Sequence, residues 1–195
     1  MTAQEIVRDR ILTHGLGIAS AHGLHALSMG DMARELELPR AGLFAHFATK
    51  ESLQLAVLEQ AADMFVRDVI EPGLKAEAGV ARVTALFGRW MHWSRSPRLK
   101  GGCPFVQASA ESDSLPEPVR VKLKEVLDHW SGVLASAVQE AKDAGRFRAD
   151  LDESQVVFEL YGLYLSHHFW HWSMKDRTAG DRTMKAFARL IEASH

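Results

Sequence analysis

The stretch from Ser28 to Leu53, SMGDMARELELPRAGLFAHFATKESL, constrains the fold more than any other part of the chain. A first short helix is predicted by side chains at the helical spacing i, i+3, i+4, i+7, namely Met29, Met32, Ala33 and Leu36. Ser28 is placed to cap its start, and Asp31 stands where a capping-box carboxylate would reach back. Pro39 cannot continue this helix but suits the start of a second, expected over about residues 39–46. A third helix is expected to open at Thr49-Lys50.

Two short helices around a tight turn form a helix-turn-helix, a unit that reads double-stranded DNA. Leu43 and Phe47 share one face of the second helix and leave another face for a partner. A short helix with small residues near its start can enter the roughly 12 Å wide major groove. Arg40 is the strongest candidate for a base or phosphate contact. The full set of candidate DNA-binding residues is Ser28, Met29, Pro39, Arg40, Ala41, Gly42, Phe44, His46 and Lys50.

The run Leu43-Phe44-Ala45-His46-Phe47-Ala48-Thr49-Lys50-Glu51 closely resembles the signature that ends the DNA-binding domain of TetR/AcrR-type repressors. The run Met32-Ala33-Arg34-Glu35-Leu36 and Gly23 are also similar to that family's pattern, so the resemblance spans about residues 5–53. Phe44 stands where the family usually has tyrosine, and Pro39 where serine is common, which removes two hydroxyl groups. The resemblance implies a homodimeric, ligand-responsive transcriptional regulator that binds operator DNA and a small-molecule effector.

The charge balance argues against a strongly basic nucleic-acid module. Residues 1–60 carry five Lys and Arg against seven Asp and Glu, a net charge of −2. We therefore expect modest non-specific DNA affinity, with much depending on dimerisation and on base and shape readout. The single cysteine excludes an internal disulfide framework and fits a reducing cytosol. The amphipathic start is unlike a secretory segment, and the uncharged stretch 160–174 is shorter than the roughly 20 residues of a membrane span. We predict a cytoplasmic protein that contacts no membrane.

Strand signals are nearly absent while helix caps recur, so the sequence predicts an all-α fold of about nine helices. An N-terminal three-helix DNA-binding domain is expected over residues 1–53, and a helical ligand-binding and dimerisation domain over residues 54–195. Beyond the helix-turn-helix, the helices are expected at about residues 2–22, 50–70, 80–94, 105–112, 115–145, 152–174 and 181–193. The run Gly101-Gly102-Cys103-Pro104-Phe105-Val106 resembles one branch of the same family, which implies an architecture but no particular ligand.

The helix expected over residues 152–174 is apolar on two faces and must therefore be covered on both. We interpret one face as packing within the domain and the other as meeting a second subunit, with a central helix of a monomer as the alternative. Together with the last helix it would form a four-helix dimer interface, as the resemblance implies. The candidate dimerisation residues are Leu160, Leu163, His167, Trp170 and His171.

Aromatic residues of the second part are abundant enough to line a cavity for a small apolar or aromatic molecule, although a plain core is the alternative. The candidate ligand-binding residues are Trp90, Trp93, Phe105, Trp130, Phe158, Tyr161 and Tyr164. His167 and His171 have the spacing of two metal ligands, but further ligands are not evident, so we expect no metal and no cofactor. Phosphate loops, a serine elbow and paired carboxylates are missing, so we expect no enzyme.

The sequence therefore favours a regulator, most simply a repressor released from a near-palindromic operator by its ligand. Two alternatives stay open. In the first, Cys103, beside Arg98 and Lys100, acts as an electrophile or redox sensor on the same scaffold. In the second, the chain is a helical binding or metal-carrier protein that no longer reads DNA.

Overall fold

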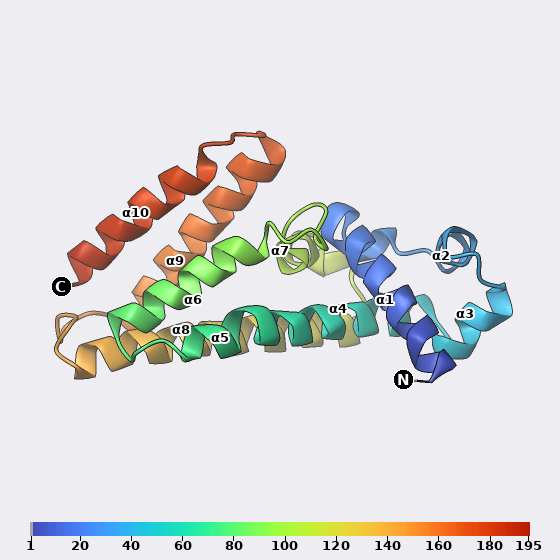
Figure 1. Cartoon of the computed structure of the whole chain (residues 1–195), viewed down its shortest axis with the longest axis horizontal. Helices are drawn as coiled ribbons and strands as arrows, with labels where there is room; N and C mark the ends of the chain where they lie inside the picture. Colours follow the sequence, from blue (N-terminus) through green and yellow to red (C-terminus); the bar gives the residue numbers. More distant parts are fainter. Residues whose placement is uncertain (1) are drawn as a thin grey trace. The chain divides into compact units, whose positions relative to one another are not determined.

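The computed structural model describes residues 2–195 and contains helices and no strands in that range. This confirms the prediction of an all-α fold (Figure 1). The π turn Val66–Ile70 joins α4 to α5 without a break, so counting this stretch once leaves nine α-helical stretches from ten labelled helices. The helices are α1 Ala3–His22, α2 Met29–Glu35, α3 Arg40–His46, α4 Lys50–Phe65, α5 Glu71–Leu74, α6 Val80–Trp93, α7 Pro104–Ala110, α8 Glu117–Asp143, α9 Glu153–His168 and α10 Ala179–Ser194.

The chain folds into two compact units that do not follow the order of the sequence. Unit 1 comprises residues 1–64 and 95–126, and unit 2 comprises residues 65–94 and 127–195. The loop and helix α7 around the Gly-Gly-Cys-Pro run therefore pack with the N-terminal helices. No helix among residues 2–195 is long and apolar enough to cross a membrane.

Unit 1 is organised around α1, which packs against both α2 and α7. Its start is fixed by a capping box, in which the Thr2 hydroxyl accepts from the Glu5 backbone N–H and the Glu5 carboxylate accepts from Thr2 N–H. Apolar side chains of α1, α2 and α3 meet in a core that is almost closed to solvent, including Ile11, Leu16 and Met32. Burial of these side chains holds the two short helices in place, because helices of seven residues are not stable alone.

The sequence predicted that the long helix starting at Lys50 ends before Pro72, but in the structure the helix runs past this proline. A proline in a helix lacks the N–H for one backbone bond and crowds the preceding turn. The π turn Val66–Ile70 lies immediately upstream of Pro72, in the turn that the proline ring would otherwise crowd. The helix thus continues to Leu74.

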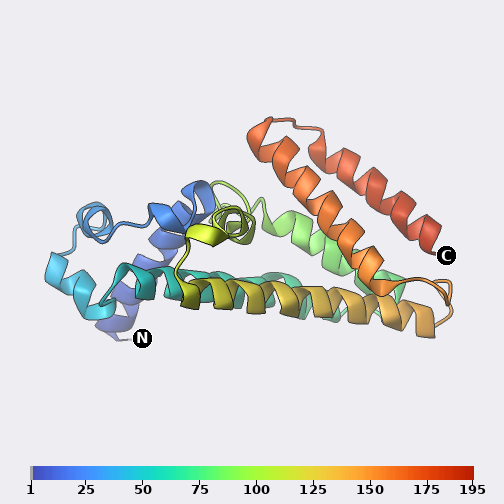
Figure 2. The same cartoon turned by 180° about the vertical axis from the view of Figure 1, so that it is seen from behind.

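Unit 2 has an aromatic core centred on Trp90 of α6. Its ring stacks on Tyr164 at a centroid distance of 3.9 Å and meets Trp130 edge-on at 5.2 Å. The helices α9 and α10 lie side by side in opposite directions in both views (Figures 1 and 2). Between them, α9 ends at His168 and a π turn, Phe169–Ser173, replaces the regular helix that we expected to reach Met174.

Candidate DNA-binding and effector sites

The turn of the helix-turn-helix forms between the end of α2 and Pro39. Ser28 caps α2 by accepting from the Asp31 N–H at 3.3 Å, as expected. The Asp31 carboxylate bonds the side chains of Ser28 and Arg34, and these bonds hold its pKa below the ordinary value. At the other end, Glu37 adopts a left-handed backbone with φ of 54°, and Leu38 N–H bonds Ala33 O at 2.8 Å. This sharp reversal delivers Pro39 to the start of α3.

The structure places the candidate DNA-binding residues at the surface of unit 1 around α3. Leu43 and Phe47 are buried and anchor the helix, as their spacing predicted. The exposed residues of the set are Pro39, Arg40, Ala41, Phe44 and Lys50, and the half-buried ones are Ser28, Met29, Gly42 and His46. An exposed phenylalanine at the surface, here 50% accessible, is suited to an apolar contact such as a thymine methyl.

The two cations of this surface differ in how they are held. Arg40 is exposed and has no ion-pair partner within residues 2–195, so its guanidinium can turn toward a ligand. Lys50 Nζ donates a hydrogen bond to the backbone carbonyl of His25. Its ammonium keeps donors for a further acceptor while the contact fixes its position near the start of α2.

Sequence reasoning missed a carboxylate that fastens the segment before α2. Glu111 ends α7, and its carboxylate accepts hydrogen bonds from the backbone N–H groups of Leu24 and His25 and contacts the His25 ring. Gly23 has a φ of 86°, and a Cβ there would lie 2.6 Å from Glu111 Oε2, so glycine permits the approach. Glu111 thus caps the end of α7 and holds the segment before α2 at the same time.

A second contact joins the same two parts of unit 1. The Ser20 hydroxyl donates to the Gly102 carbonyl at 2.7 Å and accepts from the Gly101 N–H at 3.1 Å. A Cβ on Gly101 would lie 2.3 Å from the Ser20 carbonyl oxygen, which explains why the loop needs glycine at this position. The pair of adjacent glycines was the sequence signal for a close backbone approach.

Five of the seven candidate ligand-binding residues come together in unit 2. Trp90, Trp93, Trp130, Tyr161 and Tyr164 form one group linked through ring contacts, with Phe65 between Trp93 and Trp130. Their rings lie against one another. The indole Nε1 of Trp130 is buried and meets no acceptor among the described residues.

The other two candidates lie elsewhere. Phe105 is buried in α7 and belongs to unit 1. Phe158 is 72% exposed on α9 and lines, beside Tyr161, an open hollow of about 350 Å³ on the outside of the aromatic group. The alternation of two apolar faces in α9 hid this difference, because spacing alone does not tell which face the rest of the chain covers.

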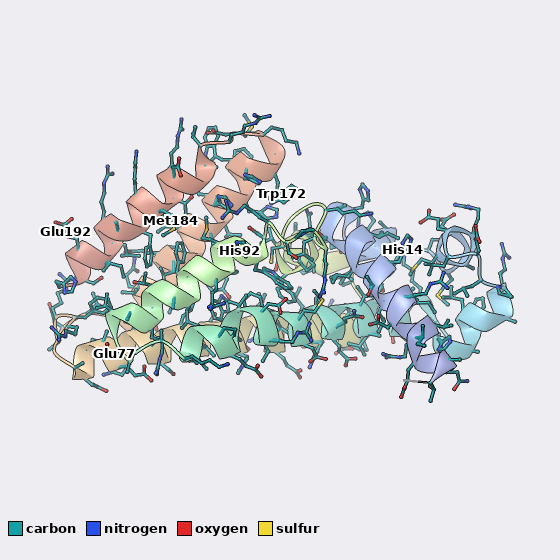
Figure 3. The ribbon with its side chains drawn as sticks, in the orientation of Figure 1. His14, Glu77, His92, Trp172, Met184 and Glu192 are labelled. Carbon is teal, nitrogen blue, oxygen red and sulfur yellow. The ribbon has the colours of Figure 1, made fainter. Side chains whose placement is uncertain are left out.

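The candidate dimerisation residues divide in the same way. Leu160 and His167 are buried within the chain itself, Leu163 and His171 are half-buried, and Trp170 is 42% exposed. The exposed apolar surface of α9, the π turn and α10 consists instead of Phe158, Leu165, Phe169, Trp170, Met174 and Met184. Met184 and Trp172 are labelled on this hairpin in Figure 3. We call the six exposed residues the hairpin face.

The three histidines of α9 and the π turn are held by packing. The rings of His167 and His171 stack at a centroid distance of 5.2 Å. Burial lowers the pKa of His168, with a smaller effect from His171, so its neutral form is favoured in the fold. No group of three or more His, Cys, Asp or Glu side chains arranged for a metal occurs in the part of the chain that the structure describes.

Cys103 is 1% exposed at the start of α7. A reactive sensor thiol needs access to its electrophile and an environment that favours the thiolate. The buried position does not support the thiol-sensor alternative.

These features define a helix-turn-helix DNA-binding protein with an attached all-helical unit. Residues 11–57 match the family described as bacterial regulatory proteins, tetR family, and residues 79–187 match the tetracycline repressor-like C-terminal domain. The chain therefore belongs to the TetR family of bacterial regulatory proteins.

Individual relatives are distant. The chain is 22% identical to the transcriptional regulator AcuR of Cereibacter sphaeroides, over 78% of this chain and 70% of that one. It is 23% identical to the transcriptional repressor DhaR of Mycobacterium sp. (strain GP1), over 76% of this chain and 74% of that one.

Solved structures share the fold. A TetR regulator from Chloroflexus aurantiacus superposes with a TM-score of 0.85 at 22% identity, covering 98% of this chain and 96% of that one. A transcriptional regulator from Saccharomonospora viridis in complex with choline gives 0.80 at 22% identity, with 96% of each chain covered. AibR in complex with isovaleryl coenzyme A and operator DNA gives 0.73 at 19% identity, covering 92% of this chain and 95% of that one.

Proposed function

We propose that the protein is a homodimeric transcriptional repressor whose grip on a near-palindromic operator is released by a small-molecule effector. The single observation that carries the proposal is the exposed start of α3, where Arg40, Ala41 and Phe44 stand on a helix anchored from behind by Leu43 and Phe47. Family membership supports DNA binding. The name of the relative DhaR, a repressor, supports the sign of regulation.

We propose that residues 1–53 bind DNA and that residues 54–195 bind the effector and form the dimer. In residues 1–53, the DNA-reading head, Arg40 contacts a base or phosphate, Phe44 contacts a thymine methyl, and His46 and Lys50 contact phosphates. Ala41 and Gly42 permit close approach of the helix, and Ser28 and Met29 lie against the DNA backbone. Two such heads related by a two-fold axis would enter successive major grooves about 34–36 Å apart.

Dimerisation is proposed to use the hairpin face rather than the buried residues of α9. Six large apolar side chains are exposed on one helical hairpin, and a second copy of the chain would cover them. Of the five candidate dimerisation residues, Trp170 is the one that lies on the hairpin face. The self-complementary use of one patch is the usual geometry of a two-fold dimer.

Effector binding is proposed for unit 2. The solved neighbours that carry choline or isovaleryl coenzyme A support a small organic effector as the class of ligand. An effector shifts the protein away from its DNA-bound form only by as much as it prefers the other form. To turn the DNA-bound form from the dominant population into a rare one, the effector must prefer the other form on the order of 10⁴-fold, or by roughly 5.5 kcal/mol. We place this activity in the cytoplasm, where the DNA lies; the expectation that the chain is not an enzyme stays a prediction.

The experiment that tests the proposal is selection of binding sites from random duplex DNA by the purified full chain, at a stated salt concentration. Recovery of a near-palindrome with two half-sites is the expected result, and it supplies the probe for effector screening. If the protein enriches no sequence above background, the proposal is refuted, and the second alternative, a helical binding protein that does not read DNA, is favoured.

A further inference from the structure

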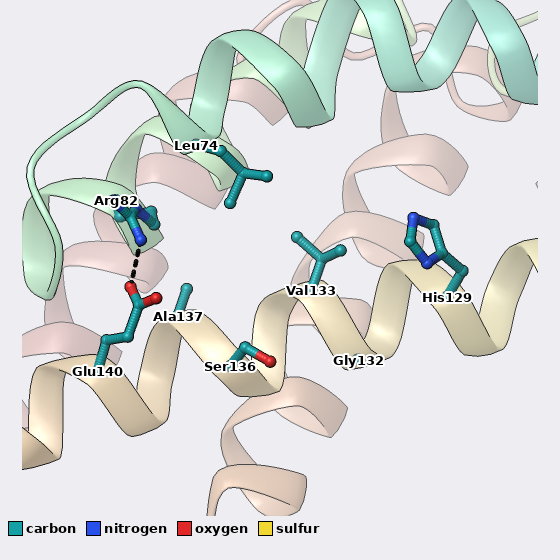
Figure 4. A pocket seen from close by; sticks show the side chains of 8 residues that line it. All are labelled: Leu74, Arg82, His129, Gly132, Val133, Ser136, Ala137 and Glu140. Atoms are coloured by element: carbon teal, nitrogen blue, oxygen red, sulfur yellow. Dashed lines mark hydrogen bonds and ion pairs between the residues drawn. The ribbon is translucent and has the colours of Figure 1, made fainter.

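Unit 2 contains a groove that none of the candidate ligand-binding residues lines. It opens between the end of α5, the start of α6 and the second half of α8, with a cavity volume of about 440 Å³ (Figure 4). That volume falls within the range of roughly 300–1,000 Å³ typical of small-molecule sites. Leu74, Gly132, Val133 and Ala137 give it apolar walls, and charged side chains stand at one end.

The charged end of the groove is a fixed ion pair. Arg82 Nη1 lies 2.6 Å from Glu140 Oε2, joining the start of α6 to α8. The same guanidinium donates through Nε and Nη2 to the Ala76 carbonyl, at 3.3 and 3.1 Å. Both its charge and most of its donors are therefore used within the fold, and the side chain is held in one orientation.

Glu140 keeps one carboxylate oxygen as an acceptor, whereas three of the five N–H groups of Arg82 are used within the fold. Only its Oε2 atom bonds Arg82, and Oε1 has no hydrogen-bond partner among the described residues. The Glu140 side chain is 39% exposed, so a ligand can reach it from the groove. An ionised carboxylate only accepts hydrogen bonds, so the group that fits here is a donor. A ligand carboxylate would meet a neutralised arginine and a like charge beside it.

The middle of the groove is shaped by a missing side chain. A Cβ built on Gly132 meets no atom within 4 Å, which leaves open space above α8 at this position. Val133 and Leu74 face this space from opposite sides (Figure 4). His129 stands at the end away from the ion pair. An apolar body several carbons long can lie along α8 with its polar group at Glu140.

We propose that this groove binds a small amphiphile with a hydrogen-bond donor, an ammonium or hydroxyl group, at one end of a short apolar body. The donor bonds Glu140 Oε1, and the body lies on Gly132, Val133 and Leu74. The effector role of such a molecule rests on the proposed function, but its binding to the groove does not. The groove is open in this structure, whereas the rings of the aromatic core lie in contact with one another.

Three six-carbon probes test the class of ligand on the full chain at pH 7. Isothermal titration calorimetry compares hexan-1-amine, hexan-1-ol and hexanoate, which each contain six carbons and carry different polar groups at one end. We expect binding in the order amine, alcohol, hexanoate, because a charge-assisted hydrogen bond to Glu140 is stronger than a neutral one. Hexanoate binding as tightly as the amine, or an amine that does not bind, overturns the proposal.

Matched variants locate the binding. Gly132→Leu fills the groove and should abolish amine binding, while Gly88→Leu, at another helical glycine whose Cβ meets nothing within 4 Å, should leave it unchanged. Leucine is the better helix former, so both variants are expected to fold; Gly132→Ala serves if the larger side chain does not. Glu140→Gln should weaken amine binding about tenfold or more and alcohol binding less. Unchanged binding in Gly132→Leu places the probe elsewhere and overturns the proposal.

The calorimetry uses no DNA, and the selection of operator sites uses no amine. Operator binding without amine binding would refute the groove alone. Amine binding without operator enrichment would refute the proposed function and leave the groove as a ligand site.

Discussion

At the scale of single residues, Arg40 tests the DNA-reading surface most directly. Arg40→Ala removes an exposed guanidinium that no residue in 2–195 holds in an ion pair. A base contact by arginine is worth about 1–3 kcal/mol and a dimer makes two, so we expect operator affinity to fall by about 2–6 kcal/mol, which is roughly 30-fold or more. Electrophoretic mobility shift with the selected operator measures it, and size-exclusion chromatography should show an intact dimer. Arg67→Ala, an equal loss of charge in unit 2, is the control and should bind normally.

A substitution of Glu111 tests whether its hydrogen bonds to Leu24 and His25 stabilise unit 1. Glu111→Gln leaves one amide oxygen in place of a carboxylate that accepts from the N–H groups of Leu24 and His25. Loss of a charged acceptor typically costs about 1–3 kcal/mol, so urea unfolding should show a lower midpoint. Asp113→Asn, an exposed carboxylate two residues away, should leave the midpoint unchanged. Equal stability of both variants would mean that the Glu111 contacts add nothing to the fold.

His168 gives the fold a dependence on pH. Burial lowers its pKa in the folded state, so between that pKa and the unfolded value of about 6.5 the unfolded chain binds more protons. Its contribution to stability is therefore complete above pH 7 and is lost as the pH falls below about 6.5. We expect His168→Gln to flatten the fall of the urea midpoint between pH 7 and 5, whereas His22→Gln, at an exposed position, should leave the fall as it is. A profile that is the same in all three proteins would contradict the assignment.

At the scale of helices, the sequence predicted where most elements stand but not which face each one buries. Caps and breakers such as Thr2, Asp152 and Gly145 are local, and the helices next to them begin or end within about two residues of the predicted places. The π turns at 66–70 and 169–173 were not predicted, although the first lies directly before Pro72, a local signal that we interpreted as the end of the helix. Leu160 and Phe158 show a different limit, since two apolar faces of one helix look alike until the neighbouring helices are placed.

The hairpin face leads to a prediction at this scale. Phe158→Arg puts a charge on the most exposed large apolar side chain of α9, which is 72% accessible. A buried, unpaired charge strongly opposes association, so the variant should elute as a monomer, or dissociate at much higher concentration, in sedimentation velocity. Val121→Arg, at a 51% exposed apolar side chain on α8, is the matched control and should remain dimeric. A Phe158→Arg protein that stays dimeric would place the subunit contact on another surface.

At the scale of the whole molecule, the near-neutral charge of the reading head limits how strongly DNA binding responds to salt. Residues 1–60 carry a net charge of −2, and the exposed cations on the surface around α3 are Arg40 and Lys50. A dimer would therefore neutralise about four phosphates, which predicts a slope of roughly −3.6 for log K against log salt concentration. Affinities for the selected operator between 50 and 200 mM salt measure this slope. Lys50→Gln should make it shallower by about two, one phosphate contact per subunit, because counterion release scales with the phosphates neutralised. A slope near −8 in the unaltered protein would mean that basic residues outside the surface around α3 also reach the DNA.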